Sequence, residues 1–392
     1  LRPLGIPTFT DKLVQEVLRM ILEAVYEPIF LDVSHGFRPK RSCHTALKQL
    51  RREFNGTRWF VEGDIKGCFD NHAVLVGLLN NKIKDARITK LIYKFLKAGY
   101  LENWQYHKTY SGTPQGGIIS PLLANIYLHE LDKFVMKLKS EFDTPGVGQI
   151  TPEYRELHNE IKRLSHRLTK VTGEEREMVL AEYKPKRQKL MTIPCTAQTD
   201  KKLKYVRYAD DFLIAVKGNR EDCQWIKSKL AEFIGDTLKM ELSEDKTLIT
   251  HSSKCARFLG YDVRVRRSGK IKRGGPGHVK MRTLNGGVEL LVPLNDKIRQ
   301  FVFTKGVAIQ KKDGSMFPVH RKYLVGLTDL EIVSVYNAEL RGICNYYGMA
   351  SNFCKLHYLA YLMEYSCLKT LASKHKTSLS KTIDKFNDGT GK

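Results

Sequence analysis

Three acidic positions carry side chains of the type that divalent metal ions take as ligands. Asp64 lies near the end of the hydrophobic run 59–65, and the adjacent Asp210 and Asp211 lie between two apolar stretches. A carboxylate among apolar residues is costly unless a cation compensates it, and adjacent carboxylates repel each other. Mg²⁺ resolves both conflicts because it binds carboxylate and phosphate oxygens, and two ions about 3.5–4 Å apart can clamp a phosphoryl transfer. An Asp-Asp turn by itself is more often a solvated loop, so this interpretation depends on the surrounding segments.

The segments around these acids predict a mixed α/β unit. Lys204–Tyr208 and Phe212–Val216 form two short apolar strands with Ala209-Asp210-Asp211 at the bend, which is typical of a β-hairpin. Trp59–Ile65 is typical of a mostly buried strand. Hydrophobic spacing predicts helices over 11–25, 73–81, 86–98, 120–139 and 222–238, and further strands over 105–110, 246–250 and 257–263.

The charge balance indicates a polyanionic partner. Lysine and arginine outnumber the acids by 66 to 42 in 392 residues, so the formal charge is +24, and a composition with 42% hydrophobic residues is that of a folded protein. A folded chain tolerates such self-repulsion when it binds a polyanion, which favours nucleic acid over a merely soluble surface or an anionic membrane surface. The length predicts two or three domains with a sizeable core.

The cysteines and the longest uncharged run exclude two further classes of protein. None of the eight cysteines forms a C-x-x-C pair, which favours a reduced compartment over a disulfide framework. The run Tyr110–Leu128 is too polar and too broken by prolines to span a bilayer. There is no signal peptide, and Leu1 is not a natural start, so we expect part of the native protein to be missing.

Two segments lie outside this pattern. Residues 152–190 carry apolar side chains at heptad spacing (Tyr154, Leu157, Ile161, Leu164, Leu168, Val171) and then Thr172-Gly173, which predicts a protruding helical hairpin. Such a hairpin could equally pack on its own domain or act as an arm that binds RNA or a partner.

Residues 254–282 hold ten basic residues against one acid and are rich in glycine, which predicts a basic linker. Amphipathic stretches over 293–304, 329–347 and 353–375 predict a helical C-terminal domain.

The motifs together resemble the palm of a reverse transcriptase. Tyr208-Ala209-Asp210-Asp211 follows the run 60–70, which contains Asp64, and Thr113-Pro114-Gln115-Gly116-Gly117 lies between them. Further matching motifs are Leu1–Pro7, Gly36-Phe37-Arg38-Pro39, Leu242–Thr247 and Phe258-Leu259-Gly260-Tyr261. With the helical C-terminal domain, the chain is similar to the bacterial, lactococcal-type group II intron-encoded reverse transcriptase/maturases.

This resemblance implies an α/β (α+β) right-hand polymerase fold. It has a ferredoxin-like palm with fingers, followed by an α-helical thumb that is the maturase domain X. The implied parts are N-terminally truncated fingers (1–57), a palm with fingers elements and the insertion (58–262), a basic linker (263–288), the thumb (289–385) and a tail (386–392). The family's N-terminal extension is absent before Leu1, Asn71 runs directly into His72 where the family has a longer stretch, and no endonuclease pattern precedes Lys392.

The resemblance also implies a role for each matching residue. Asp64 and Asp210 would be the principal ligands of two Mg²⁺ ions, with Asp211 and the Ile65 carbonyl in support. Residues implied to contact the dNTP are Arg2 at the triphosphate, Phe69 under the sugar, Gln115 and Gly116 in the segment that lines the nucleotide and template site, and Lys246 at the pyrophosphate. Residues implied to contact nucleic acid are Arg38, Pro114, Gly117, the primer grip Phe258, Leu259, Gly260 and Tyr261, and the basic residues Arg264, Arg266, Arg267, Lys270, Lys272 and Arg273.

We therefore expect RNA-directed DNA synthesis by two-Mg²⁺ nucleotidyl transfer, combined with splicing of a group II intron. The partners would be the intron RNA, an RNA template with a DNA primer, and the target DNA of retrohoming, in the bacterial cytoplasm and without a membrane. Two alternatives remain at this point. One is a splicing factor that binds RNA without chemistry, for which the basic segment supplies affinity. The other is an RNA-dependent RNA polymerase, against which the bulky Phe69 argues by excluding a 2′-hydroxyl.

Overall fold

The computed structural model describes residues 5–66, 71–102, 105–107, 116–146, 149–197, 200–243, 247–268, 270–274, 279–281, 283 and 285–386. The chain forms two compact units, one of residues 1–256 with 264–288 and the other of residues 257–263 with 289–392. The short strands β10 (Ala256–Phe258), β11 (Tyr261–Val265) and β14 (Val288–Leu291) each contain a boundary between the units.

An antiparallel sheet forms the centre of the first unit. Its strands are β1 (Trp59–Lys66), β6 (Lys202–Tyr208), β7 (Asp211–Lys217), β8 (Glu241–Leu242) and β9 (Ile249–His251). The order is β6-β7-β1-β8, and β9 also pairs with β1. The predicted hairpin is confirmed, because Tyr208 pairs with Asp211 at the end of the antiparallel β6–β7 ladder.

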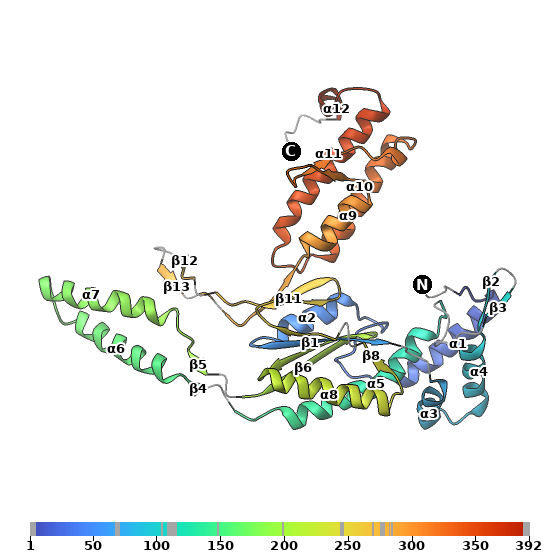
Figure 1. Ribbon diagram of the computed structural model, residues 1–392, viewed down its shortest axis with the longest axis horizontal. Coiled ribbons are helices and arrows are strands. Elements are labelled where there is room, and N and C mark those ends of the chain that lie inside the picture. Colours follow the sequence, from blue (N-terminus) through green and yellow to red (C-terminus); the bar gives the residue numbers. More distant parts are fainter. Residues whose placement is uncertain are drawn as a thin grey trace. The chain divides into compact units, whose positions relative to one another are not determined.

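Side chains alternate between the two faces of this sheet. Val61, Phe212 and Ile214 belong to the main apolar core, which the helices α5 (Ser120–Phe142) and α8 (Arg220–Asp236) complete on that face. On the opposite face lies α2 (Cys43–Glu53), which buries Ala46, Leu47 and Leu50 (Figure 1). One face is therefore buried against α5 and α8, while the other is covered only in part.

The remaining helices of the first unit agree with the hydrophobic spacing. α1 (Phe9–Tyr26) is capped by Thr8, whose hydroxyl accepts from the Asp11 amide, and it is followed along the chain by α3 (His72–Lys82) and α4 (Ala86–Lys97). The predicted strand over 105–110 corresponds to β3 (Gln105–His107) as far as the structure describes it, since residues 108–110 lie outside the described residues, and its partner β2 (Tyr100–Glu102) was not predicted. A second small hairpin, β12 (Lys272–Gly274) with β13 (Val279–Met281), lies in the segment predicted to be a linker.

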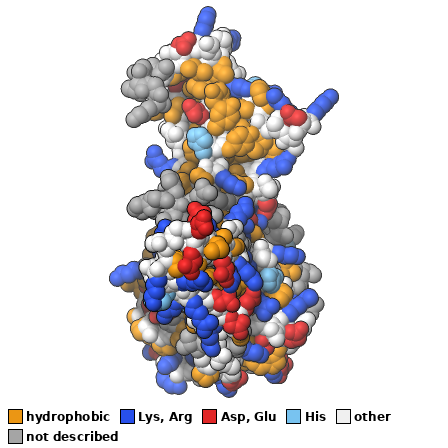
Figure 2. All heavy atoms as spheres, turned by 90° about the vertical axis from the view of Figure 1, so that its left-hand side faces the viewer, with side chains coloured by type: hydrophobic (Ala, Val, Ile, Leu, Met, Phe, Trp, Pro, Cys, Tyr) orange, Lys and Arg blue, Asp and Glu red, His pale blue; other side chains and the backbone are white. Residues whose placement is uncertain are grey.

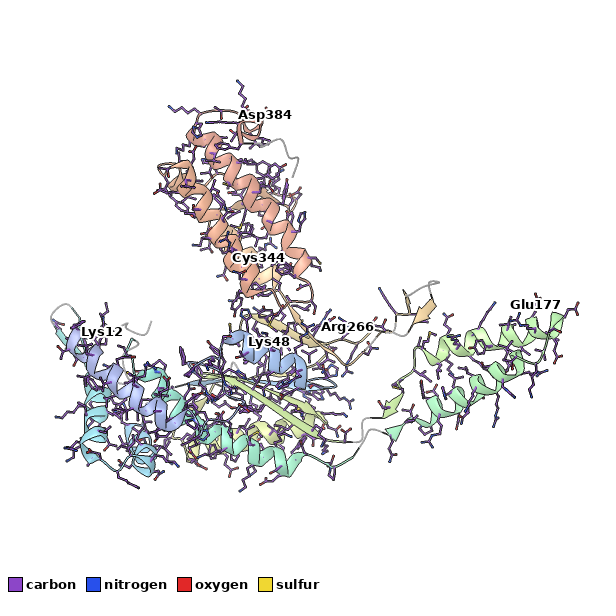
Figure 3. All side chains as sticks on the ribbon, turned by 180° about the vertical axis from the view of Figure 1, so that it is seen from behind. Lys12, Lys48, Glu177, Arg266, Cys344 and Asp384 are labelled. Atoms are coloured by element: carbon purple, nitrogen blue, oxygen red, sulfur yellow. The ribbon has the colours of Figure 1, made fainter. Side chains whose placement is uncertain are left out.

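The inserted segment is a helical hairpin, as its heptad spacing predicts. α6 (Pro152–Leu168) and α7 (Gly173–Leu190) pack together through Leu157, Ile161, Leu164 and Val179, and β4 (Gln149–Ile150) pairs with β5 (Thr196–Ala197) at the base. Figure 2 faces the free end of this hairpin, marked by Glu177 in Figure 3, and shows acidic and basic side chains intermingled there. Residues 152–190 contain ten basic and seven acidic side chains, so the hairpin carries little of the net charge of +24.

The second unit is mainly helical. Its elements are η1 (Leu294–Ile298), α9 (Arg299–Thr304), β15 (Ala308–Gln310), β16 (Met316–Pro318), η2 (Lys322–Leu324), α10 (Asp329–Tyr346), η3 (Phe353–Leu356), α11 (His357–Lys374) and α12 (Leu379–Phe386). A capping box between Thr328 and Glu331 starts α10. Tyr336 is buried and its hydroxyl lies 2.8 Å from Ser366 Oγ, whereas Tyr358 and Tyr361 are exposed. The tyrosines of this unit thus divide between core and surface.

No described helix is both long enough and apolar enough to cross a membrane. The seven cysteines that the structure describes are all free thiols.

Candidate active site

The two strands that carry the acids are direct neighbours in the central sheet. In the antiparallel β1–β7 ladder, Asp64 lies opposite Asp211. Opposed residues share a face of the sheet and have Cβ atoms about 4.5–5.5 Å apart. Asp210 occupies the two-residue loop just before Asp211, and both are exposed, while Asp64 is half-buried. The structure therefore places Asp64 and Asp211 on one sheet face at one end of the β1–β7 ladder, with Asp210 in the adjoining turn.

These acids suit a divalent metal ion that shares its ligands with a substrate. Like charges directly opposite one another destabilise a sheet, and a cation between them removes that cost. Within the described part of the chain, no group of three or more His, Cys, Asp or Glu side chains, the three acids included, is arranged as a metal-binding cluster. Mg²⁺ does not need one, because it binds through one or two carboxylates, several waters and substrate phosphates. Ile65 follows Asp64 on β1, and its side chain lies in the core.

The loop between β6 and β7 has a strained backbone. Ala209 has φ = 55°. A residue with a Cβ adopts this left-handed conformation at a cost of about 1–2 kcal/mol. Such strain persists only where the surroundings over-determine the conformation. The turn formed by Tyr208, Ala209, Asp210 and Asp211, called here the acidic turn, therefore needs outside support.

Two glycines let neighbouring segments approach the acidic turn. A Cβ on Gly36 would lie 2.4 Å from the Ala209 nitrogen, so only glycine allows the segment 33–36 to lie against the turn. A Cβ on Gly63 would lie 2.0 Å from Cζ of Phe212, the residue that pairs with Gly63 across the ladder. The sequence motifs contained both glycines, but only the fold shows that they make room for the turn and its strand.

Arg38, predicted to bind nucleic acid, lies in the interior. Its side chain is 4% exposed and forms an ion pair of 2.9 Å with Glu27. Its Nη1 group also donates to the carbonyls of Leu31 at 2.7 Å and Ser34 at 2.9 Å. These partners occupy the guanidinium group, which argues against direct contact with nucleic acid and gives Arg38 a structural role.

The Gly116-Gly117 segment lies next to α1 and the start of α5. The Gln15 side-chain oxygen accepts from the Ile118 amide at 2.9 Å, and a Cβ on Gly117 would meet Ser120 Oγ at 2.6 Å. Gly116 is exposed and has φ = 122°. Other residues that the resemblance implies lie outside the described residues: Arg2, Phe69, Pro114, Gln115 and Lys246.

Hydroxyl groups from α10 and the residue after it hold the predicted primer grip in the second unit. Leu259 and Gly260 both have positive φ, at 46° and 70°. The Tyr346 hydroxyl donates to the Leu259 carbonyl at 2.6 Å, and the Tyr347 hydroxyl donates to the Gly260 carbonyl at 3.2 Å. The Tyr261 hydroxyl in turn donates to the Tyr346 carbonyl. The sequence did not predict this support, because some 87 residues separate the partners.

The predicted basic residues lie on strand β11 and in the segment that follows it along the chain. Arg264, Arg267 and Lys270 are exposed, and Arg266, labelled in Figure 3, is half-buried. The Arg267 guanidinium also donates to Ser252 Oγ at 3.1 Å. Lys272 and Arg273 lie on β12. The exposed members present positive charge to solvent, which is what phosphate contacts require.

The sequence as a whole identifies the class of protein. Residues 1–144 and 185–263 match the family described as reverse transcriptase (RNA-dependent DNA polymerase), and residues 288–390 match the family described as type II intron maturase. The chain therefore belongs to the reverse transcriptase family, in the branch with an intron maturase domain and a right-hand polymerase fold. The unmatched residues 145–184 contain α6 and part of α7, so the helical hairpin is an insertion relative to the general family.

Individual relatives narrow this class. The chain is 74% identical to the group II intron-encoded protein LtrA of Lactococcus lactis subsp. cremoris, over all of this chain and 65% of that protein. It is 38% identical to an uncharacterized 91 kDa protein in the cob intron of Schizosaccharomyces pombe and 36% identical to a putative COX1/OXI3 intron 1 protein of Saccharomyces cerevisiae. Each match covers 98% of this chain and 46% of the relative. The chain thus spans about half to two thirds of the length of these relatives.

Proposed function

We propose that this chain is the catalytic core of an RNA-directed DNA polymerase that also serves as a splicing cofactor, or maturase, for a group II intron RNA. The pairing of Asp64 with Asp211 beside the acidic turn carries the proposal, because it places the acids of two separate motifs on one sheet face. The family membership and the 74% identical intron-encoded relative support it.

The acids would act with dNTP substrates and two Mg²⁺ ions. Asp64, Asp210, Asp211 and the Ile65 carbonyl would hold the ions, which would supply activation of the primer 3′-hydroxyl and stabilisation of the pyrophosphate leaving group. The protein itself contributes position and a fixed electrostatic environment. The sheet aligns Asp64 with Asp211, and Gly36 lets the segment 33–36 support the turn from behind.

The other implied residues complete the proposed site. Those that would contact the nucleotide are Arg2, Phe69, Gln115, Gly116 and Lys246. Those that would contact template, primer or intron RNA are Pro114, Gly117, the primer grip 258–261, Arg264, Arg266, Arg267, Lys270, Lys272 and Arg273. The target DNA of retrohoming would be a further partner, and the bacterial cytoplasm, where an intron is transcribed, would be the location.

Replacing one acid tests the polymerase proposal. Asp210→Ala removes an exposed carboxylate from the acidic turn, and we expect it to lower dNTP incorporation on a primed RNA template by more than about 10³-fold. The matched control is Asp236→Ala, which removes an exposed carboxylate at the end of α8 and should leave incorporation unchanged. Substantial residual synthesis by Asp210→Ala would refute the assignment, and a preference for NTPs over dNTPs would favour an RNA polymerase.

The maturase activity is a second function, favoured by the match of residues 288–390 to the intron maturase family. Structured RNA is recognised by shape and phosphate contacts, which need no carboxylate chemistry. We therefore expect the double variant Asp210→Ala/Asp211→Ala to promote splicing of its intron while making no DNA. Sequencing of copurified RNA identifies the partner: intron RNA supports the proposal, and random RNA or tRNA contradicts it.

A further inference from the structure

An ion pair lies fully buried between β6 and α5, on the face of the sheet opposite the acids. The side chains of Arg207 and Asp132 are both 0% exposed. Arg207 donates from Nε to Asp132 Oδ1 and from Nη2 to Asp132 Oδ2, each at 2.7 Å. Tyr205 donates its hydroxyl to Asp132 Oδ1 at 2.9 Å. Two parallel bonds to one carboxylate fix both the position and the plane of the guanidinium group.

The remaining donors of Arg207 connect this ion pair to the acidic turn. Nη1 donates to the Ala209 carbonyl at 2.8 Å and to Asn125 Oδ1 at 3.2 Å, and Nη2 donates to Ser34 Oγ at 2.8 Å. With the two bonds to Asp132, all five N–H groups of the guanidinium group are used. One bond therefore runs from a rigid, buried cation directly to the backbone of the turn.

The residues around Arg207 hold the turn from a second side. The Asn125 side-chain amide donates to the Gly36 carbonyl at 2.7 Å, and the His35 amide donates to the Arg207 carbonyl at 2.9 Å. Gly36 in turn lies against the Ala209 nitrogen. Arg207 thus donates to the Ala209 carbonyl on one side of this residue, and the backbone of Gly36 packs closely against its nitrogen on the other. This two-sided contact explains how a non-glycine residue keeps φ = 55°.

We propose that Arg207 is a positioning residue for the reaction. Its bond to the Ala209 carbonyl holds the strained conformation of the acidic turn and so places Asp210 and Asp211 relative to Asp64. Asp132 orients Arg207 and has no contact of its own with the turn among the described residues. The inference rests on the proposed function for its catalytic consequence, but the link between Arg207 and the turn stands on the contacts alone.

The variant Arg207→Lys distinguishes a role in positioning the acidic turn from a contribution to folding stability alone. A lysine keeps the charge that faces Asp132, but its single ammonium cannot also reach the Ala209 carbonyl in the fork geometry of arginine. The matched control is Arg321→Lys in the second unit. Arg321 is 1% exposed and donates to both oxygens of Glu339, at 2.8 and 3.1 Å. Both variants weaken a buried ion pair, and only the first touches the acidic turn.

Two measurements on the full chain test the proposal. Hydrogen exchange, followed by mass spectrometry over the peptide 205–215, should be at least about tenfold faster in Arg207→Lys and unchanged in Arg321→Lys. Single-turnover incorporation of dNTP should fall about 10–100-fold at saturating dNTP in Arg207→Lys, with KM changed less than about threefold. In Arg321→Lys both kinetic constants should match those of the wild type, even if its melting temperature falls by as much as that of Arg207→Lys.

The possible outcomes separate this inference from the proposed function. If Arg207→Lys exchanges and reacts like Arg321→Lys, Arg207 does not position the turn. If the wild type incorporates no dNTP, the proposed function fails, and the exchange data still decide whether Arg207 holds the turn. If Arg207→Lys lacks a cooperative unfolding transition, Asn125→Ala replaces it. That variant removes one acceptor of Arg207 and the donor to the Gly36 carbonyl, so it should show the same two changes to a smaller extent, and normal exchange over 205–215 in it overturns the proposal.

Discussion

Gly36→Ala adds one methyl group directly behind the acidic turn. The new Cβ would lie 2.4 Å from the Ala209 nitrogen and 3.1 Å from both Ala209 Cα and the Tyr208 carbonyl carbon. All three neighbours are backbone atoms, so no side-chain rotation can relieve the contact. Gly36 itself cannot withdraw freely, because its carbonyl accepts from Asn125 at 2.7 Å and the preceding His35 amide is bonded to Arg207.

The size of the effect follows from these distances. Ordinary van der Waals contact with a Cβ begins at 3.4 Å, so Ala209 or residue 36 must move by about 1 Å. A shift of about 1 Å at catalytic groups lowers rates by about 10²-fold, and inserting a methyl group into a packed site costs about 1–3 kcal/mol. We therefore expect Gly36→Ala to lower dNTP incorporation by about two orders of magnitude and to remain folded at 25 °C.

Primer extension on an RNA template and thermal unfolding check both parts of this expectation. The matched control is Gly77→Ala in α3, where the added Cβ has nothing within 4 Å and should raise helix stability by about 0.5–1 kcal/mol without changing the rate. A Gly36→Ala variant that polymerises at the wild-type rate would show that the acidic turn does not depend on close approach of segment 33–36. A variant that loses only stability would lead to the same conclusion.

Three further predictions follow from single contacts. Gly63→Ala should lower the free energy of unfolding by about 1–3 kcal/mol, because the added Cβ overlaps the buried Phe212 ring. Thermal unfolding of the double variant with Phe212→Leu should show that part of the lost stability is recovered. No recovery would show that this overlap is not the cause of the loss. Tyr346→Phe removes the hydrogen bond to the Leu259 carbonyl and should lower the free energy of unfolding by about 0.5–1.5 kcal/mol. It should also weaken primer-template binding in an anisotropy titration, with the KM for dNTP unchanged. Unaltered binding would show that Tyr346 does not support the primer grip. Burial lowers the pKa of His129, whose ring nitrogens have no hydrogen-bond partner among the described residues. The unfolded chain therefore binds a proton at His129 more readily than the folded chain does. As a result, the free energy of unfolding is highest with respect to His129 above about pH 6.5, and it falls as the pH drops toward the lower folded-state pKa of this residue. His129→Leu should then lose less stability than the wild type between about pH 7 and pH 5, measured by denaturant unfolding, and parallel losses would contradict this source.

Local patterns predicted most of the elements around the site. The β6–β7 hairpin, strand β1 and the α6–α7 hairpin each follow from a spacing of apolar residues within a few turns or one strand. The incomplete predictions involve weaker local signals. The β2–β3 pairing and the β12–β13 hairpin are short, and in the second case glycine and basic residues give no apolar alternation.

Residue type alone misassigned one member of the site and overlooked others. Arg38 belongs to a motif that suggests nucleic-acid contact, yet its donors are used by Glu27 and by backbone carbonyls in the interior. Arg207 was overlooked, although a charged residue inside an apolar strand beside the acids was a visible signal. Such a signal shows that a partner is required but not which one, because Asp132 lies 75 residues away along the chain.

By itself, the sequence determined the chemistry that the protein can carry. The acids, the glycines beside them, the net charge of +24 and the order of the motifs are properties of residue type and spacing, and they define the class before any coordinates. Only the tertiary structure decided which groups meet: Asp64 opposite Asp211, the Gly36 segment against Ala209, and the Arg207 guanidinium shared between Asp132 and the turn. The physical reason is that apolar periodicity is a local property, whereas a buried hydrogen bond or a close backbone contact depends on the register and packing of distant segments.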